Sequence, residues 1–472
     1  MRRLASGNPQ LDQVLGGGFP EHSTTLVMGL PGTGKTILAQ SIAFEVATTA
    51  RPALILSTVS EPLDRMLRYV QEFTFFDAAK VGDAILYEDL NEILRTSGTA
   101  DAVRHIIELL KEHRPAVLVI DSFKALHSFS DDERSFRTSL AELSGVLATA
   151  ATSTFLIGEY EADEVPQLPE FAVADAIVEL VLKKVGVRDE RFLRVIKLRG
   201  SSYLSGEHAF RLSPRGMTLF PRLQAPTAPV DYLLTGARLA TGVQPLDTML
   251  HDGLWQGSST LVLGPAGSGK TLLGLHFIFK GIEMGERGLI ATMQENPTQL
   301  QRIVAGFGWD LTEAIKSKAL ELMYVSPVDL YIDEFVSRVA EAMAGKTRLL
   351  IDSLNDLERA TSDEARFKDF MYSLNQTMSV AGVSTVMTEE VADLFNTARL
   401  SQHGISHISD NVILLSYLRD AATIRRTITV IKTRASEHQP DVREFVISPA
   451  GLEIGQAFGA AVDEGPQGRL RV

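Results

Sequence analysis

Residues 29 to 36 read GLPGTGKT and residues 264 to 271 read GPAGSGKT, each between an apolar run and a segment of helical period. In such a GxxxxGK[ST] pattern the glycines let successive backbone N–H groups wrap around a phosphate, and the following helix adds its N-terminal dipole. A glycine turn without a ligand is the alternative, but the full pattern found twice favours nucleotide binding. The predicted phosphate-binding residues are Gly29, Gly32, Thr33, Gly34, Lys35 and Thr36, and Gly264, Gly267, Ser268, Gly269, Lys270 and Thr271.

The lysine and the threonine that close each pattern predict two different contacts. Lys35 and Lys270 are expected to neutralise the β- and γ-phosphates of ATP and so to take part in catalysis. The hydroxyls of Thr36 and Thr271 are expected to bind Mg²⁺. ATP and Mg²⁺ are therefore the predicted cofactors.

The two glycine loops belong to a tandem duplication. Subtracting 35 from 270 gives an offset of 235, which also aligns LASGNPQLDQVLGGGFPEHSTTLVMG (4–29) with LATGVQPLDTMLHDGLWQGSSTLVLG (239–264) without a gap. Between the copies, PRLQAPTAPVDYLLTG is rich in proline and small residues, which is typical of a linker. The sequence predicts domains over 1–222 and 238–458, a linker over 223–237 and a loosely ordered tail over 459–472.

Composition narrows the class of protein. The chain has 472 residues, 45% apolar and 22% charged, and no cysteine, so no thiolate site is available. No apolar run is long enough for a membrane span, and MRRLASGNPQ lacks the apolar region of a secretory signal, so we expect a cytoplasmic protein with no membrane contact. The net charge of -13 opposes the positive field that nucleic-acid binding needs.

Within each copy, short apolar runs alternate with stretches of helical period. In the first copy ALILST (53–58), AVLVIDS (116–122) and TFLIGEY (154–160) are predicted strands, and DAVRHIIELLKEH (101–113) is a predicted helix. Continuous apolar strands crossed by helices indicate a parallel sheet buried on both faces, hence an α/β fold. The later segments IVELVLKK, FLRVIKLRG and HAFRLSP predict an antiparallel extension at the sheet edge.

An aspartate ends one apolar strand in each copy, Asp121 in VLVIDS and Asp352 in LLIDS. At the carboxyl end of a parallel strand beside the phosphate loop, such an aspartate can orient a water bound to Mg²⁺. An apolar run that ends in Asp is common by itself. The glycine loop at a similar distance ahead of it in both copies favours the metal role.

Hydrolysis also needs a group that activates water, and the strand after the glycine-loop helix is the usual place for it. That strand leads into STVSEPLDRM in the first copy and ATMQENPTQL in the second, so the candidates are Glu61 and Glu295. The alternative is an acidic residue in the first turn of the next helix, which Pro62 after Glu61 also fits.

Taken together, the tandem glycine loops, SG(x)xxLDxxLxxG ahead of each, a strand ending in IDS and a late K-x-R resemble the KaiC family. The resemblance covers both halves of the chain. It implies two RecA-like P-loop NTPase domains, ATP held between neighbouring subunits of a homohexameric ring, ATPase activity and a protein partner that the sequence does not identify. It also implies that Lys197 and Arg199, and Lys432 and Arg434, reach the phosphates of the adjoining subunit. Alternation along a strand puts both cations of K-x-R on one face, which equally suits a solvated edge.

The chain departs from the family at two places. The family carries two consecutive glutamates at the water-activating position, but here Ser60 and Gln294 replace the first, so hydrolysis depends on Glu61 and Glu295. The family's autophosphorylated Ser-Thr pair matches Ser406 and a following histidine. Two interpretations of Ser406 stay open, a single phosphorylation site and an ordinary polar loop serine.

Three functions remain on these grounds. The first is a KaiC-like ATPase ring, with serine/threonine autokinase activity in the second copy left open. The second is a signalling scaffold that binds ATP and scarcely hydrolyses it. The third is a RecA-like DNA-dependent ATPase, which the mixed or acidic segments FKALHSFSDDERSF and LNDLERATSDEARF after the IDS strands disfavour.

Overall fold

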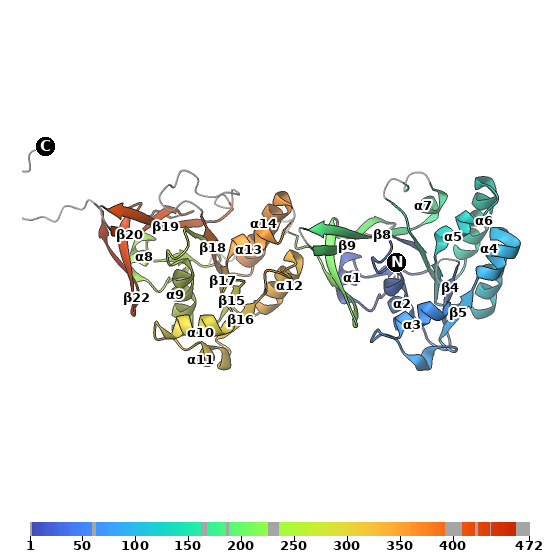
Figure 1. Cartoon of the computed structure of the whole chain (residues 1–472), viewed down its shortest axis with the longest axis horizontal. Helices are drawn as coiled ribbons and strands as arrows, with labels where there is room; N and C mark the ends of the chain where they lie inside the picture. Colours follow the sequence, from blue (N-terminus) through green and yellow to red (C-terminus); the bar gives the residue numbers. More distant parts are fainter. Residues whose placement is uncertain are drawn as a thin grey trace, which may run out of the picture. The chain divides into compact units, whose positions relative to one another are not determined.

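The structure of the chain, a computed structural model, describes residues 2–58, 63–161, 164, 168–185, 188–224, 236–361, 363–391, 408–420, 423–434 and 436–458. Contacts divide the chain into two compact units, Met1–Arg222 and Leu223–Val472 (Figure 1). Among the described residues, no helix has the length and apolar character that crossing a membrane requires.

The first unit alternates strands and helices along the chain. Its strands are β1 (Arg3–Leu4), β2 (Phe19–Pro20), β3 (Thr24–Met28), β4 (Ala53–Ser57), β5 (Ile85–Asp89), β6 (Val117–Asp121), β7 (Ser153–Gly158), β8 (Ala176–Val185), β9 (Arg188–Leu198), β10 (Glu207–Ser213) and β11 (Gly216–Phe220). Its helices are α1 (Pro9–Val14), α2 (Lys35–Val46), α3 (Leu63–Val70), the 3-10 turn η1 (Ala78–Lys80), α4 (Asn91–His113), α5 (Phe123–Ser128), α6 (Glu133–Leu147) and α7 (Pro169–Val173).

The second unit follows the same plan. Its strands are β12 (Arg238–Leu239), β13 (Leu254–Trp255), β14 (Ser259–Gly264), β15 (Gly288–Thr292), β16 (Leu320–Tyr324), β17 (Arg348–Asp352), β18 (Ser384–Glu390), β19 (Asn411–Asp420), β20 (Thr423–Lys432), β21 (Arg443–Ser448) and β22 (Gly451–Ala457). Its helices are α8 (Gln244–Met249), α9 (Lys270–Glu283), α10 (Pro297–Ala305), α11 (Leu311–Lys316), α12 (Ile332–Ala342), α13 (Leu354–Arg359) and α14 (Glu364–Val380).

Nine of the described strands in each unit form one sheet, with the same order in both, while β1 with β2 and β12 with β13 form separate two-stranded sheets. In the first unit the order is β5-β4-β6-β7-β3-β8-β9-β10-β11, and in the second it is β16-β15-β17-β18-β14-β19-β20-β21-β22. The strands from β5 to β8 pair in parallel, whereas β9, β10 and β11 pair antiparallel beyond β8. The predicted α/β fold with an antiparallel edge extension is therefore confirmed in both copies.

Helices cover both faces of the parallel part of each sheet. In the first unit α1 and α2 pack on one face, and α4, α5 and α6 pack on the other (Figure 1). In the second unit α8 to α11 and α12 to α14 divide the faces in the same way. The strand side chains are buried on both sides, and burial of each large apolar side chain contributes about 1.5–3 kcal/mol. This two-sided burial explains why the parallel strands are continuous apolar runs in the sequence.

Two elements differ from the sequence expectation. The helix expected over 101–113 begins ten residues earlier, at Asn91, and contains a kink at Gly98, where φ is 77° and ψ is -176°. Strand β5 lies at the sheet edge with only Ile85 fully buried, so its sequence ILYED lacks a continuous apolar run. The expectation missed both because tertiary packing outweighs the local signal there.

An ion pair with a fully buried arginine lies in the second unit. Arg348, the first residue of β17, is 0% exposed and bonds both carboxylate oxygens of Glu286 at 2.7 and 3.0 Å. Its Nη1 donates to the carbonyl oxygens of Ala240 and Phe277 at 2.8 and 2.7 Å. The first residue of the equivalent strand β6 is Val117. The arginine thus satisfies these acceptors in the second unit, and Val117 cannot make such contacts at the equivalent position of the first.

We expect Arg348→Ala to destabilise the second unit by about 3–5 kcal/mol, because it leaves the Glu286 carboxylate without its partner. Both tryptophans of the chain, Trp255 and Trp309, lie in this unit, so their fluorescence during urea unfolding reports on it. The control is Arg338→Ala, which removes an exposed partner of Glu334 and should cost at most about 1 kcal/mol. Equal midpoints for the two variants would contradict the stabilising role of the buried pair.

Candidate nucleotide site

Each phosphate loop connects the central parallel strand to the helix behind it. In the first unit Gly29, Gly32 and Gly34 have φ values of 145°, 77° and 102°, a region that residues with a Cβ rarely adopt. A Cβ on Gly29 would lie 2.1 Å from the carbonyl oxygen of Leu180 in β8. In the second unit a Cβ on Gly264 would lie 2.7 Å from the carbonyl oxygen of Leu415. Close packing against the neighbouring strand therefore requires glycine at Gly29 and Gly264, whereas the positive φ favours glycine at Gly32 and Gly34.

The loop lysine begins the helix in each copy. Lys35 is 7% exposed, and its Nζ donates to the carbonyl oxygens of Gly29 and Leu30, both at 2.9 Å. Lys270 is 9% exposed and donates to the carbonyl oxygen of Pro265 at 2.9 Å. Burial lowers the pKa of both lysines, and nearby carboxylates oppose that shift. A cation that is held inside the loop and largely removed from water binds an anion strongly.

The threonine after each lysine meets the strand-end aspartate. Thr36 Oγ1 donates to Asp121 Oδ2 at 2.5 Å, and Thr271 Oγ1 donates to Asp352 Oδ2 at 2.8 Å. Burial raises the pKa of Asp352, although hydrogen bonds from Thr388 and Thr271 and the charge of Lys270 act in the opposite direction. A hydroxyl and a carboxylate that converge beside a phosphate loop are the oxygen donors Mg²⁺ prefers, so the residues present fit this ion.

A pocket of about 670 Å³ opens beside the first phosphate loop. Gly32, Lys35, Thr36, Asp121 and Glu159 are among its lining residues. Pockets for small ligands typically measure about 300–1,000 Å³, so this one suits a nucleotide. The structure thus brings together loop, lysine, threonine and aspartate as the sequence predicts.

Of the two candidate water-activating glutamates, the described residues include only Glu295, in the second copy. Glu295 follows β15, and its backbone N–H donates to Thr292 Oγ1 at 3.2 Å. Gln294 instead donates from Nε2 to Ser353 Oγ at 3.0 Å and to Asp356 Oδ2 at 3.1 Å, so its amide is tied to the start of α13. Glu61 and Ser406 lie outside the described residues.

The phosphate loop and the K-x-R cations of one unit lie at opposite ends of its parallel strands. Arg199 N donates to the carbonyl oxygen of Asp175, whose own N–H bonds Thr24, the first residue of β3. The phosphate loop leaves the far end of β3, about 16 Å along the strand. The side chains of Arg199 and Asp175 pair at 3.4 Å.

The second copy repeats this placement. Arg434 N donates to the carbonyl oxygen of Asp410, and Asp410 N donates to Ser259 at the start of β14. Lys432 Nζ donates to the carbonyl oxygen of Ser409 at 2.8 Å, and Lys197 Nζ donates to that of Phe171 at 3.3 Å. Burial lowers the pKa of both lysines, and the adjacent arginine lowers it further.

Sequence reasoning missed one carboxylate at each site. Glu159 follows β7, the strand next to β3, and it lines the first pocket. Glu390 ends β18 and is paired in register with Gly264, the first glycine of the second loop. Both stand at the carboxyl end of a strand, as Asp121 and Asp352 do, so the same signal in TFLIGEY and VMTEE could have found them.

Two α/β units, each with a phosphate loop, a loop lysine and a threonine paired to a strand-end aspartate, define a tandem P-loop ATPase with RecA-like domains. The chain belongs to the KaiC family of ATPases, whose model matches residues 4–224 and 239–458. A "Circadian clock oscillator protein KaiC" of Picosynechococcus is 26% identical over 97% of this chain and 90% of its own length. That of Thermostichus vulcanus is 27% identical over 95% and 88%. The "Circadian clock protein KaiC3" of Synechocystis is 26% identical over 97% and 92%.

We expect Gly29→Ala to open the first unit around α2, because the new Cβ meets the Leu180 carbonyl oxygen and the backbone conformation alone costs about 1–3 kcal/mol. Hydrogen–deuterium exchange of peptides from α2 should then be faster than in the unmodified chain. Gly145→Ala is the matched control, because Gly145 lies within α6 with no atom within 4 Å of a new Cβ. That change should stabilise the helix by about 0.5–1 kcal/mol. Unchanged exchange in α2 of Gly29→Ala would contradict the packing argument.

Proposed function

We propose that the chain hydrolyses ATP at both phosphate loops and works as a nucleotide-driven homohexameric ring. The observation that carries the proposal is the convergence of lysine, threonine and aspartate at one sheet edge in both copies. The ring rests on the placement of the K-x-R cations at the opposite edge, where they cannot reach the phosphates of their own unit.

In the proposed reaction, a water oxygen bonds to the γ-phosphorus while the bond to the bridging oxygen breaks and leaves its electron pair on ADP. Lys35 or Lys270 neutralises charge on the β- and γ-phosphates. Thr36 with Asp121, and Thr271 with Asp352, would hold Mg²⁺, which supplies charge neutralisation when bound. Glu61 or Glu295 accepts the proton of the attacking water.

The cations Lys197, Arg199, Lys432 and Arg434 serve the neighbouring subunit in this proposal. A cation supplied in trans is a recurring way to stabilise the charge that spreads over a transferred phosphoryl group. The relatives are named as clock proteins, and a protein partner of unidentified chemistry belongs to the proposal. Binding to nucleic acid does not, because the net charge is -13.

A signalling scaffold with little turnover is the second candidate. Gln294 stands where the family has the first glutamate, and its amide is engaged with Ser353 and Asp356 rather than with the phosphate loop. Autokinase activity would require Ser406 to accept the γ-phosphoryl group of a bound ATP. Retention of ³²P on the protein, lost in Ser406→Ala, would establish that activity.

We expect Glu61→Gln and Glu295→Gln each to lower the turnover of its own site by about 10²–10⁴-fold, because an amide does not take up the proton of water. Phosphate release is measured for each variant with the other site silenced by Lys270→Ala or Lys35→Ala. The double lysine variant gives the background rate. Turnover equal to that of the matched parent would remove the catalytic assignment, and an inactive parent that binds ATP would favour the scaffold.

Mixing two inactive variants tests the contact across subunits. Both variants carry Lys35→Ala, which silences the first site. One also carries Lys270→Ala, which removes the lysine of the second phosphate loop, and the other carries Arg434→Ala, which removes the cation. Rings of either variant alone should be inactive. Mixed rings should regain part of the ATPase activity, because one variant supplies the loop and the other supplies the arginine. No recovery in rings shown to mix would contradict a trans role, and a monomer with bound ATP, measured by light scattering, would contradict the ring.

A further inference from the structure

A glutamate stands beside the phosphate loop in each unit. It lies at the end of β7 or β18, the strand between the one that leads into the loop and the one that ends in Asp121 or Asp352. In the second unit Gly264 and Glu390 are register partners, and Val391 N donates to the carbonyl oxygen of Gly264 at 3.2 Å. In the first unit Met28 pairs with Gly158, so Glu159 follows directly opposite Gly29. Adjacent strands lie about 5 Å apart, so each glutamate is nearer to the phosphate loop than any residue of β4 or β15.

Strand alternation directs these side chains to the phosphate face. Phe155 and Ile157 of β7 pack in the core that contains α2, and Glu159 continues their side of the strand. Val386 of β18 packs in the core that contains α9, and Glu390 continues its side in the same way. Burial lowers the pKa of Lys35, and Glu159 is the first carboxylate that opposes this shift; Glu390 has that place for Lys270.

The backbone of each glutamate is held by the helix that follows the aspartate strand. Lys124, three residues after Asp121, donates from Nζ to the carbonyl oxygen of Glu159 at 2.7 Å. Asn355, three residues after Asp352, donates to the carbonyl oxygen of Glu390 at 3.1 Å and accepts from its N–H at 2.6 Å. Different residue types thus make the same contact in the two copies.

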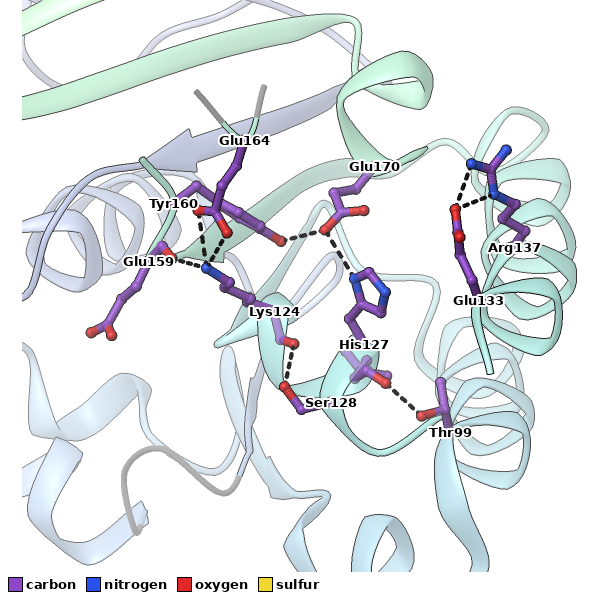
Figure 2. Close-up of polar contacts among 11 residues, drawn as sticks. Thr99, Lys124, His127, Ser128, Glu133, Arg137, Glu159, Tyr160, Glu164 and Glu170 are labelled. Atoms are coloured by element: carbon purple, nitrogen blue, oxygen red, sulfur yellow. Dashed lines mark hydrogen bonds and ion pairs between the residues drawn. The ribbon is translucent and has the colours of Figure 1, made fainter. Parts of the chain in front are cut away.

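In the first unit a network fixes Lys124 itself. Its Nζ also bonds both carboxylate oxygens of Glu164 at 2.8 and 3.1 Å and lies 5.0 Å from the ring centroid of Tyr160. Tyr160 donates its hydroxyl to Glu170, which is 0% exposed. Figure 2 shows the Glu159 side chain extending away from this network while its backbone is bound to Lys124. The contact from Lys124 thus holds the backbone of Glu159 and leaves its carboxylate to line the pocket beside the phosphate loop.

We propose that Glu159 and Glu390 are further catalytic carboxylates that accept a hydrogen bond from the attacking water, with Lys124 and Asn355 as their positioning residues. The inference rests on the proposed ATPase function and adds a second carboxylate where Ser60 and Gln294 replace the first glutamate of the family. No proton is transferred to Glu159 or Glu390 in this role. They orient the water whose proton Glu61 or Glu295 receives.

The test measures kcat, KM and the Kd for ATP in the full chain, with the second site silenced by Lys270→Ala. Glu159→Ala should lower kcat at least about tenfold with KM and Kd changed less than twofold, because the lost contact forms with water and not with ATP. Glu159→Gln keeps an oxygen acceptor and should retain more activity. Glu161→Ala removes a carboxylate of the same loop that does not line the pocket and should leave kcat unchanged.

A kcat of Glu159→Ala equal to that of its parent would overturn the proposal, and so would a loss of ATP affinity that accounts for the whole effect. Lys124→Ala should lower kcat at constant KM, and an unchanged kcat would remove its positioning role. Glu390→Ala with Lys35→Ala repeats the test for the second site. An inactive parent would instead mark failure of the proposed function, because no variant could then lower its rate.

Discussion

The close approach of the phosphate loop to the strand beside it is the constraint on which each unit depends. Gly29 and Gly264 pack against carbonyl oxygens of β8 and β19, so no side chain fits at either position. The loop must then turn at once, and its lysine becomes the first residue of the helix. The same turn places the next threonine against the aspartate of a strand two positions away in the sheet. The backbone contact of the glycine and the threonine–aspartate hydrogen bond together fix loop, helix and aspartate strand.

The direction of the parallel strands places the phosphate loop and the K-x-R cations at opposite edges of each sheet. All carboxyl ends meet at the edge that holds the loop, the aspartate and the strand-end glutamates, as expected for open α/β sheets. The antiparallel strands β9 and β20 return to the opposite edge with Lys197 and Lys432 near their ends, and Arg199 and Arg434 follow just beyond the strands. A single unit therefore separates its own cations from its own phosphates, and this separation is what makes assembly a chemical requirement of the proposed mechanism.

The sequence predicts the residues whose role is local and misses those whose role depends on strand order. A glycine loop and an apolar strand ending in Asp are contiguous signals, so Thr36 and Asp121 could be found, and their side chains are hydrogen-bonded in the structure. Glu159 is near the loop only because β7 inserts between β3 and β6, and no local pattern states that order. The buried Arg348 could not be anticipated either, because its acceptors come from three separate segments.

Comparison of β7 with β18 shows how the two copies diverge under this constraint. On the phosphate face both strands lead to a glutamate, but the preceding residue on the other face is Gly158 in one and Glu389 in the other. A Cβ at Gly158 would lie 2.0 Å from the ring of Tyr160, whereas Glu389 is 4% exposed and burial, followed by the charge of Glu358, raises its pKa to about 7. The helix after the aspartate strand has changed with it, from Lys124 to Asn355, yet the contact to the glutamate backbone persists. The face beside the phosphate loop keeps the same contact in both copies while the opposite face differs, which is the pattern expected if the glutamate itself serves the proposed reaction.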